Sequence, residues 1–349
     1  MAKIEDFSLE RFMAFDQKTS LSFSQGINVF IGTNSTGKTL LMKALYSMIK
    51  VCEQAHLQQI LNDPIRLKIM AADKFKGVFK PDHLGRLVRR SRGQANGVLE
   101  MKYDGEKISV TVSSRGGALN LEYSSLPDPT PAVFLPVHEF LSASEGFVHA
   151  YSNRELFFDE TYYDLSLALS GALLRGPRLE EIKSLVEPLE KEIGGHVTRD
   201  GERFYIRLPE GKMEASIASE GYRKIAGLIY LINNGSLTQN GILFWDEPEA
   251  NLNPKLVKVI VETLHKLAES GVQIFVTTHD YLVSQKLSLL AEYKRGTNMR
   301  FFAFQQARRG AGVNIEWGDT LAQIDHNPIL DEFSAHYDEE INLFARPEG

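Results

Sequence analysis

Apolar runs alternate with stretches of helical spacing along this chain, and the alternation predicts a mixed α/β fold. Strands are predicted at residues 4–9, 21–23, 27–31, 242–245, 272–276 and 299–304. Helices are predicted at residues 40–50, 254–269 and 281–293. Because the last three strands are separated by helices, we expect them to lie parallel in one sheet.

Two hairpins and a helical segment interrupt this series. Residues 98–103 and 107–112 alternate apolar and polar positions across Asp104-Gly105, which is typical of an antiparallel hairpin. A second hairpin is expected to turn at Asp200-Gly201. Residues 153–193 are mostly helix formers with a break near Gly176-Pro177, so they predict at least two helices. We describe 148–195 as a helical arm.

Length and composition indicate an ordinary globular protein. With 349 residues and 43% hydrophobic content, the chain can bury a full core. A single cysteine, Cys52, excludes an internal disulfide and a thiolate zinc cage, so a cytoplasmic location is expected. The first residues lack an apolar leader, and no apolar run approaches the roughly 18 residues of a membrane span. We therefore expect no membrane partner.

The charge is unevenly distributed. The formal net charge of −6 argues against generic affinity for nucleic acid. Residues 66–92 nevertheless hold nine basic residues against two acids, a balance of +7, which leaves −13 for the remainder. This stretch lies in a basic insertion at 53–97. It is either a solvated surface or a contact for a nucleic-acid backbone or an acidic partner. The nucleic-acid contact would use Arg86, Arg89, Arg90 and Arg92.

The strongest chemical signal follows the predicted strand at 27–31. Eight residues fit the phosphate-binding pattern G-x-x-x-x-G-K-[ST], namely Gly32, Thr33, Asn34, Ser35, Thr36, Gly37, Lys38 and Thr39. In such a loop, backbone N–H groups and the next helix surround the β-phosphate. Lys38 reaches the β and γ oxygens, and the Thr39 hydroxyl suits Mg²⁺. The sequence therefore predicts a nucleotide site.

A second chemical site follows the strand at 242–245. Asp246 and Glu247 end that apolar strand, at the sheet edge where α/β proteins bind ligands. We assign Asp246 to the Mg²⁺ shell, usually through water. Glu247 is the candidate general base for the attacking water.

Other segments carry candidate phosphate contacts. Residues 218–224 precede an apolar helix, which places the Ser219 hydroxyl and the Gly221 amide at a helix N-terminus. Residues 276–280 end the next strand with His279, which can reach a γ-phosphate.

In this order the motifs at 32–39, 246–254 and 277–280 resemble the ABC-type ATPase heads. More narrowly, they resemble the prokaryotic AAA group of overcoming-lysogeny-defect ATPases and their SMC-like and RecF-like relatives, over about residues 4–304. The resemblance implies an α/β P-loop NTPase fold: a mainly parallel sheet flanked by helices, with an N-terminal antiparallel β subdomain and an inserted helical arm.

The resemblance also implies a head-to-head homodimer around ATP and Mg²⁺. Ser219 and Gly221 of one subunit would then cap the ATP of the other, Asn251 would lie near the seam, and His279 would be the switch histidine. The signature reads Ser-Glu-Gly, and the spacing from Lys38 to Ser219 is longer than in transporter ATPases. Both departures argue against a transporter subunit.

Several assignments stay open. The metal-binding glutamine of many relatives is missing after residues 133–135, so His138 or Glu139 either replaces it or has a core or loop role. Arg11 either contacts the nucleotide or is a surface arginine. The acidic C-terminal segment, 305–349, is too short for the nuclease domain of the overcoming-lysogeny-defect enzymes, and its acids are expected on a solvated helical tail: Asp319, Asp325, Asp331, Glu332, Asp338, Glu339 and Glu340.

The function predicted from the sequence is an ATP-hydrolysing switch. By family analogy it controls a separate effector, such as a nuclease or toxin in phage defence, or works in DNA repair. One alternative is an ATP-gated nucleic-acid-binding protein that uses the basic stretch at 66–92. Another is a structural subunit that binds ATP and barely hydrolyses it.

Overall fold

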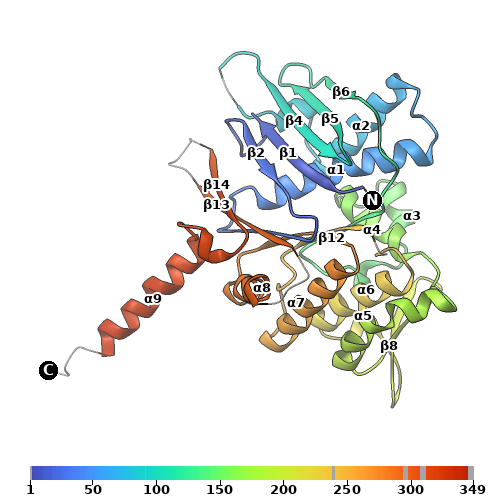
Figure 1. The fold of residues 1–349 in the computed structure, drawn as a ribbon. Helices are drawn as coiled ribbons and strands as arrows, with labels where there is room; N and C mark the ends of the chain where they lie inside the picture. Colours follow the sequence, from blue (N-terminus) through green and yellow to red (C-terminus); the bar gives the residue numbers. More distant parts are fainter. Residues whose placement is uncertain (1, 91, 238–239, 294–297, 307–311, 345–349) are drawn as a thin grey trace.

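A computed structural model describes residues 2–90, 92–237, 240–293, 298–306 and 312–344 (Figure 1). A six-stranded sheet crosses the middle of the molecule, in the order β14-β13-β3-β12-β11-β7. Its inner strands are β13 (Met299–Gln306), β3 (Ile27–Gly32), β12 (Gln273–Thr278) and β11 (Ile242–Asp246), and β7 (Ala132–Leu135) forms one edge. These five are parallel, which confirms the parallel arrangement predicted for the strands at 242–245, 272–276 and 299–304. The antiparallel edge strand β14 (Val313–Gly318) was not predicted.

A five-stranded antiparallel sheet forms the N-terminal lobe, in the order β2-β1-β4-β5-β6. Its strands are β1 (Ile4–Glu10), β2 (Thr19–Ser22), β4 (Asn96–Tyr103), β5 (Glu106–Ser113) and β6 (Leu119–Tyr123). This sheet confirms the predicted antiparallel subdomain and its hairpin. A small third sheet contains the hairpin at Asp200-Gly201, in strands β8 (His196–Asp200), β9 (Arg203–Leu208) and β10 (Gly211–Glu214).

The two faces of the central sheet border different cores, because alternate residues of a strand point to opposite sides. In β3, Val29 and Ile31 belong to one core and Phe30 to the other. Phe30 is part of a row of aromatic rings from neighbouring strands, in which the Phe244 and Phe275 ring centroids lie 5.0 Å apart. Helix α1 (Lys38–Leu57), which follows the phosphate-binding loop, packs on this aromatic face.

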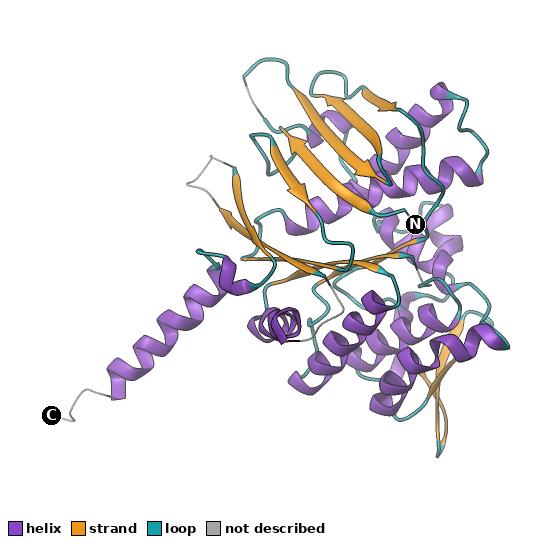
Figure 2. Cartoon of the chain, in the orientation of Figure 1, coloured by secondary structure: helices purple, strands orange, loops and turns teal. Residues whose placement is uncertain are grey.

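Most remaining helices cover the opposite face (Figure 2). They are α3 (Phe147–Ser152), α4 (Glu160–Leu169), α5 (Pro177–Ile193), α6 (Glu220–Asn233), α7 (Pro254–Glu269) and α8 (Tyr281–Tyr293). The segment predicted as a helical arm contains α3, α4 and α5. Helix α5 lies against α6 and α7, because Leu185, Val186 and Leu189 are buried there.

The basic stretch at 66–92 is only partly a surface. It contains most of α2 (Pro64–Phe79), which packs on α1, and the short helix η1 (Leu84–Leu87). Lys74 is 2% exposed and forms ion pairs with Glu160 and Asp164 of α4. A buried ammonium group needs such partners, so Lys74 joins helices and is not part of a contact surface.

A buried amide joins the N-terminal lobe to the central sheet. The Gln273 side chain accepts a hydrogen bond from the Ile4 N–H at 2.9 Å. Its amide nitrogen donates to the carbonyls of Ile4 and Ser24, at 2.8 and 2.9 Å. Gln273 begins strand β12, so this strand is hydrogen-bonded directly to the start of β1.

Helix α9 (Pro328–Phe344) projects away from the body (Figure 1). It follows a short helix, η4 (Leu321–Gln323). The five predicted acids that lie on α9 are exposed, as predicted, but Asp319 and Asp325 are exposed in the loops before it and are not on the helix.

Candidate functional site

The loop after β3 is shaped by two glycines. Gly37 has φ of 93°, and a Cβ there would lie 3.1 Å from the Phe15 ring and 3.2 Å from the Ala14 side chain. A Cβ on Gly32 would lie 2.4 Å from the Phe304 carbonyl oxygen. Any other residue would be strained at 37 and would clash at 32. The loop therefore curls tightly into α1, as the predicted phosphate cradle requires.

Lys38 lies inside this loop. Its ammonium group donates to the carbonyls of Gly32 and Thr33, at 2.7 and 2.9 Å. The residue is 5% exposed, and burial lowers its pKa, with Glu247 and Asp246 acting in the opposite direction. The predicted phosphate contact is thus held at the centre of the loop.

Thr39 and Asp246 meet where α1 begins and β11 ends. The Thr39 hydroxyl donates to Asp246 Oδ1 at 2.9 Å. Thr277 of β12 donates to the same oxygen, because β11 and β12 pair in register with Asp246 opposite Thr277. Burial raises the pKa of Asp246, and these hydroxyl groups act against that rise. A hydroxyl and a carboxylate oxygen suit Mg²⁺, which prefers oxygen ligands.

The candidate base and the candidate switch histidine form a pair. Glu247 Oε1 lies 3.1 Å from His279 Nδ1, and both side chains are partly exposed. Glu247 has φ of 46°, an unfavourable value for a residue with a side chain. Its backbone N–H donates to the Thr277 hydroxyl at 3.0 Å, which helps to hold this conformation.

Lys224 of α6 holds the loop that runs from Glu247 to Ala250. Its ammonium group donates to the carbonyls of Glu247 at 3.2 Å and of Ala250 at 2.9 Å. The side chain is 7% exposed, and burial lowers its pKa to about 8. Asn251, the next residue, has φ of 63° and is exposed, so the loop presents it at the surface.

Glu249 links the loop after β11 to the end of β12. Its Oε1 accepts from the Thr278 hydroxyl at 2.6 Å and from the His279 N–H at 3.3 Å. The residue is 8% exposed, and burial raises the pKa of its carboxyl group. Glu249 therefore fixes the backbone that carries His279.

The predicted signature lies at the start of α6. Ser219 is exposed and caps the helix, since its hydroxyl accepts from the Tyr222 N–H at 3.4 Å. Gly221 is buried, and a Cβ there would lie 3.0 Å from Leu252 and 3.1 Å from Leu256. The serine thus faces outward while the glycine packs on the loop that carries Asn251.

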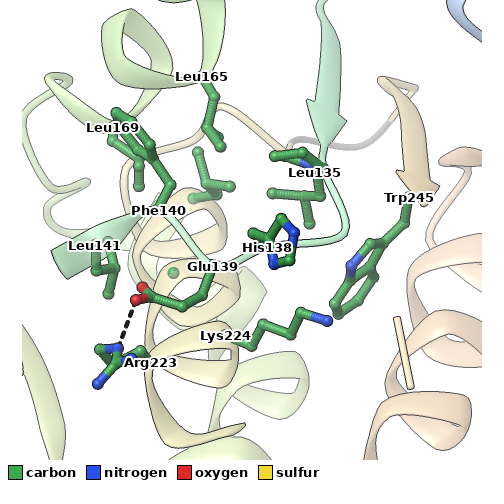
Figure 3. A pocket seen from close by; sticks show the side chains of 13 residues that line it. Leu135, His138, Glu139, Phe140, Leu141, Leu165, Leu169, Arg223, Lys224 and Trp245 are labelled. Carbon is green, nitrogen blue, oxygen red and sulfur yellow. Dashed lines mark hydrogen bonds and ion pairs between the residues drawn. The ribbon is translucent and has the colours of Figure 1, made fainter. Parts of the chain in front are cut away.

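Glu139 is paired with the signature helix. Its Oε1 lies 2.6 Å from Arg223 Nε, and only 5% of the Glu139 side chain is exposed (Figure 3). Ser142 also hydrogen-bonds to this carboxylate. His138, in contrast, is exposed. It lines a pocket together with Glu139 and Arg223. These contacts favour a loop role for Glu139 over replacement of the metal-binding glutamine.

Arg89 links the segment after η1 to the residues beside the phosphate-binding loop. Arg11 is exposed, and its carbonyl accepts from the Arg89 N–H at 2.9 Å. The Arg89 guanidinium donates to the Ala14 carbonyl at 2.8 Å, and Ala14 is the neighbour of Gly37. Arg86, Arg90 and Arg115 line an open cleft beside Arg89.

Sequence reasoning gave no role to Lys224, Glu249 or Thr277. A signal was present for Thr277, because two threonines end a buried strand beside Asp246. No comparable signal marked Lys224 or Glu249, since their partners are backbone groups and hydroxyls brought together by the fold.

Known proteins match this chain at two levels. Residues 129–284 match a family model described as an AAA domain, putative AbiEii toxin, Type IV TA system. A segment of 74 residues is 36% identical to the macrolide export ATP-binding/permease protein MacB of Bdellovibrio bacteriovorus. That match covers 21% of this chain and 11% of the relative, so the chain spans about a tenth of that protein.

Solved structures extend the comparison to the whole fold. An SMC head bound to the C-terminal winged-helix domain of ScpA has a TM-score of 0.54 at 12% identity, covering 91% of this chain and 98% of that one. An SMC head from Pyrococcus furiosus, with an extended coiled coil and bound to the C-terminal domain of ScpA, has a TM-score of 0.53 at 12% identity. It covers 98% of this chain and 100% of that one. Among the described residues, no helix has the length and apolarity to cross a bilayer. The family match covers less than half of the chain, and the fold of the described residues is that of solved SMC heads.

Proposed function

We propose that the chain is an ATP-hydrolysing switch, in which two copies close head-to-head around two ATP molecules. The proposal rests on two pairs of side chains that lie next to each other at the ends of neighbouring strands. Thr39 pairs with Asp246, and Glu247 pairs with His279. Together they supply metal ligands and a base at one edge of the sheet.

The residues of one chain would have separate roles in ATP hydrolysis. Lys38 would exchange its loop carbonyls for the β and γ phosphate oxygens, and Mg²⁺ held near Thr39 and Asp246 would neutralise the phosphate charge. Glu247 would accept a proton from the attacking water, while His279 orients that carboxylate and contacts the γ-phosphate. The exposed Ser219 of the second copy would complete the site in trans.

The consequence of closure would be control of a separate effector, such as a nuclease or toxin in phage defence, or work in DNA repair. Solved SMC heads with this fold are bound to a domain of another protein, ScpA. That observation supports an output through a partner protein and leaves its identity to experiment.

The decisive experiment is the Glu247→Gln variant. It should retain ATP binding, lose most turnover and accumulate an ATP-dependent dimer in sedimentation velocity. Glu262→Gln, an exposed residue in the middle of helix α7, is the matched control and should behave as wild type. Turnover by Glu247→Gln at the wild-type rate would overturn the assignment of the base. Steady phosphate release by the wild-type chain would exclude the alternative of a structural subunit that binds ATP and barely hydrolyses it.

A second candidate function is supported by the arginine cleft. Arg86, Arg90 and Arg115 line an open cleft close to the loop that carries Arg11. In an ATP-gated nucleic-acid-binding protein, this cleft would contact the phosphate backbone. Arg86→Gln with Arg90→Gln should then weaken DNA binding and flatten its salt dependence. Unchanged affinity would favour the effector switch.

A further inference from the structure

Residues 11–16, between strands β1 and β2, pack directly on the phosphate-binding loop, and we call them the β1–β2 turn. A Cβ on Gly37 would lie 3.1 Å from the Phe15 ring and 3.2 Å from the Ala14 side chain. Phe15 is 1% exposed, and its ring meets the Phe304 ring edge-on, with centroids 6.5 Å apart. The position of Gly37, and of the loop N–H groups around it, therefore depends on where this turn lies.

The β1–β2 turn has an unfavourable backbone. Arg11 has φ of 49° and Met13 has φ of 48°, values that residues with a side chain rarely adopt. Within the turn, the Phe15 N–H donates to the Phe12 carbonyl at 2.9 Å, and the Arg11 N–H donates to the Asp16 carbonyl at 3.3 Å. A backbone of this kind persists where the surrounding structure holds it in place. The turn therefore needs contacts from outside it.

The segment after η1 supplies such contacts, and Arg89 makes several of them. The Leu87 carbonyl accepts from the Met13 N–H at 2.8 Å. The Arg89 guanidinium donates to the Ala14 carbonyl at 2.8 Å and to the Met13 carbonyl at 3.4 Å. Its Nε lies 3.5 Å from Asp16 Oδ1. A guanidinium suits this task because its N–H donors are fixed in one plane and can hold neighbouring acceptors together.

We propose that Arg89 is a positioning residue for nucleotide binding, which acts on Gly37 through the β1–β2 turn. This inference rests on the proposed ATP-binding function. The effect should fall on affinity, because the loop N–H groups surround the β-phosphate that ATP and ADP share. The candidate base follows β11 and the candidate switch histidine follows β12, so turnover at saturating ATP should change less than affinity. Arg89 would then serve the nucleotide site, although its place in the basic stretch at 66–92 suggested a nucleic-acid contact.

The test measures the affinity of the full chain, with Mg²⁺, for ADP and for a non-hydrolysable ATP analogue by isothermal titration calorimetry. Arg89→Gln should weaken the binding of both by about tenfold, as expected for the loss of one hydrogen bond from a charged donor. Its turnover number at saturating ATP should stay close to that of wild type. Arg89→Lys keeps a charged donor for the Ala14 carbonyl and should recover part of the affinity. Arg66→Gln, an exposed arginine in the same basic stretch, removes the same charge and should bind both nucleotides as wild type does.

Phe15→Leu provides the second arm, because it shortens the ring that touches Gly37 and leaves Arg89 in place. It should weaken ADP binding as well. The double variant with Arg89→Gln should lose less affinity than the two single losses combined, because both changes act through the same contact. If Arg89→Gln does not fold, Arg89→Lys and Phe15→Leu carry the test, and wild-type ADP affinity in both would overturn the inference.

Three other results would be decisive. Wild-type affinity in Arg89→Gln, or an equal loss in Arg66→Gln, would overturn the role of Arg89 and leave the ATPase proposal intact. A lower turnover number with unchanged affinity would overturn the route through the phosphate-binding loop. A wild-type chain that binds neither nucleotide would instead overturn the proposed function itself.

Discussion

His279 Nδ1 and Glu247 Oε1 lie 3.1 Å apart, so the candidate switch histidine and the candidate base contact each other directly. A histidine in this position can orient the carboxylate through the contact between Nδ1 and Oε1. The two residues are therefore expected to act as one unit.

Removal of either residue should slow ATP hydrolysis by roughly a hundredfold or more, since general-base contributions are of that order. The double variant, Glu247→Gln with His279→Ala, should be little slower than the slower single variant, because residues that act together are not additive. Phosphate release at saturating ATP measures both effects. His149→Ala, an exposed histidine on α3, is the control. Fully multiplicative losses would show that the two side chains act independently.

Thr277→Val should reduce turnover while preserving the shape of the strand. The change removes the hydroxyl that donates to Asp246 Oδ1 and accepts from the Glu247 N–H. Loss of two hydrogen bonds at a buried site is expected to cost about 1–3 kcal/mol of stability. Thr111→Val, on β5 of the N-terminal lobe, controls for the substitution itself. We expect the dependence of turnover on Mg²⁺ concentration to shift for Thr277→Val alone.

Lys224 predicts a specific dependence of stability on pH. Its pKa in the folded chain is about 8, below the ordinary value of 10.5. Between these values the unfolded chain binds more protons, so the stability that Lys224 contributes rises as the pH increases from 8 towards 10.5. Urea unfolding of wild type and Lys224→Met should diverge by on the order of 1 kcal/mol between pH 8 and 9.5.

Lys224→Met should also slow hydrolysis at pH 7.5, because the carbonyls of Glu247 and Ala250 lose their donor. Lys224→Arg, which keeps the charge and the donors, should recover part of the activity. A pH-independent stability difference between wild type and Lys224→Met would contradict the lowered pKa. Equal losses of hydrolysis in Lys224→Met and Lys224→Arg would show that side-chain packing alone matters at this position.

Gly221→Ala and Gly227→Ala form a matched pair within α6. A Cβ at 221 would press on Leu252 and Leu256, at 3.0 and 3.1 Å, whereas the nearest atom to a Cβ at 227 is 3.8 Å away. Alanine is the better helix former by about 1 kcal/mol. Gly227→Ala should therefore stabilise the chain, and Gly221→Ala should destabilise it or displace the loop at Asn251. Thermal unfolding and turnover, measured together, distinguish these outcomes.

The sequence predicted the central sheet well, because its strands are apolar on both faces and end in recognisable motifs. It also predicted the glycine-rich loop between β3 and α1 and the Asp246-Glu247 pair at the end of β11, and the chemical roles of both stay predictions. The edge strand β14 was missed although Val313, Ile315 and Trp317 alternate with polar residues, the same pattern that predicted the first hairpin.

Side-chain networks were harder to predict than elements. The Glu139–Arg223 pair joins residues 84 positions apart, and the Lys74 cluster joins α2 to α4. Such pairs depend on which helices meet, and periodicity within one segment carries no information about that. The same reason explains why 153–193 was expected as an arm, although α5 packs on α6 and α7.

The amide of Gln273 has a mechanical consequence. It holds the first strand of the antiparallel lobe against the strand that carries Thr277 and His279. A displacement of β12 would therefore pull directly on β1, because the two strands share these buried hydrogen bonds.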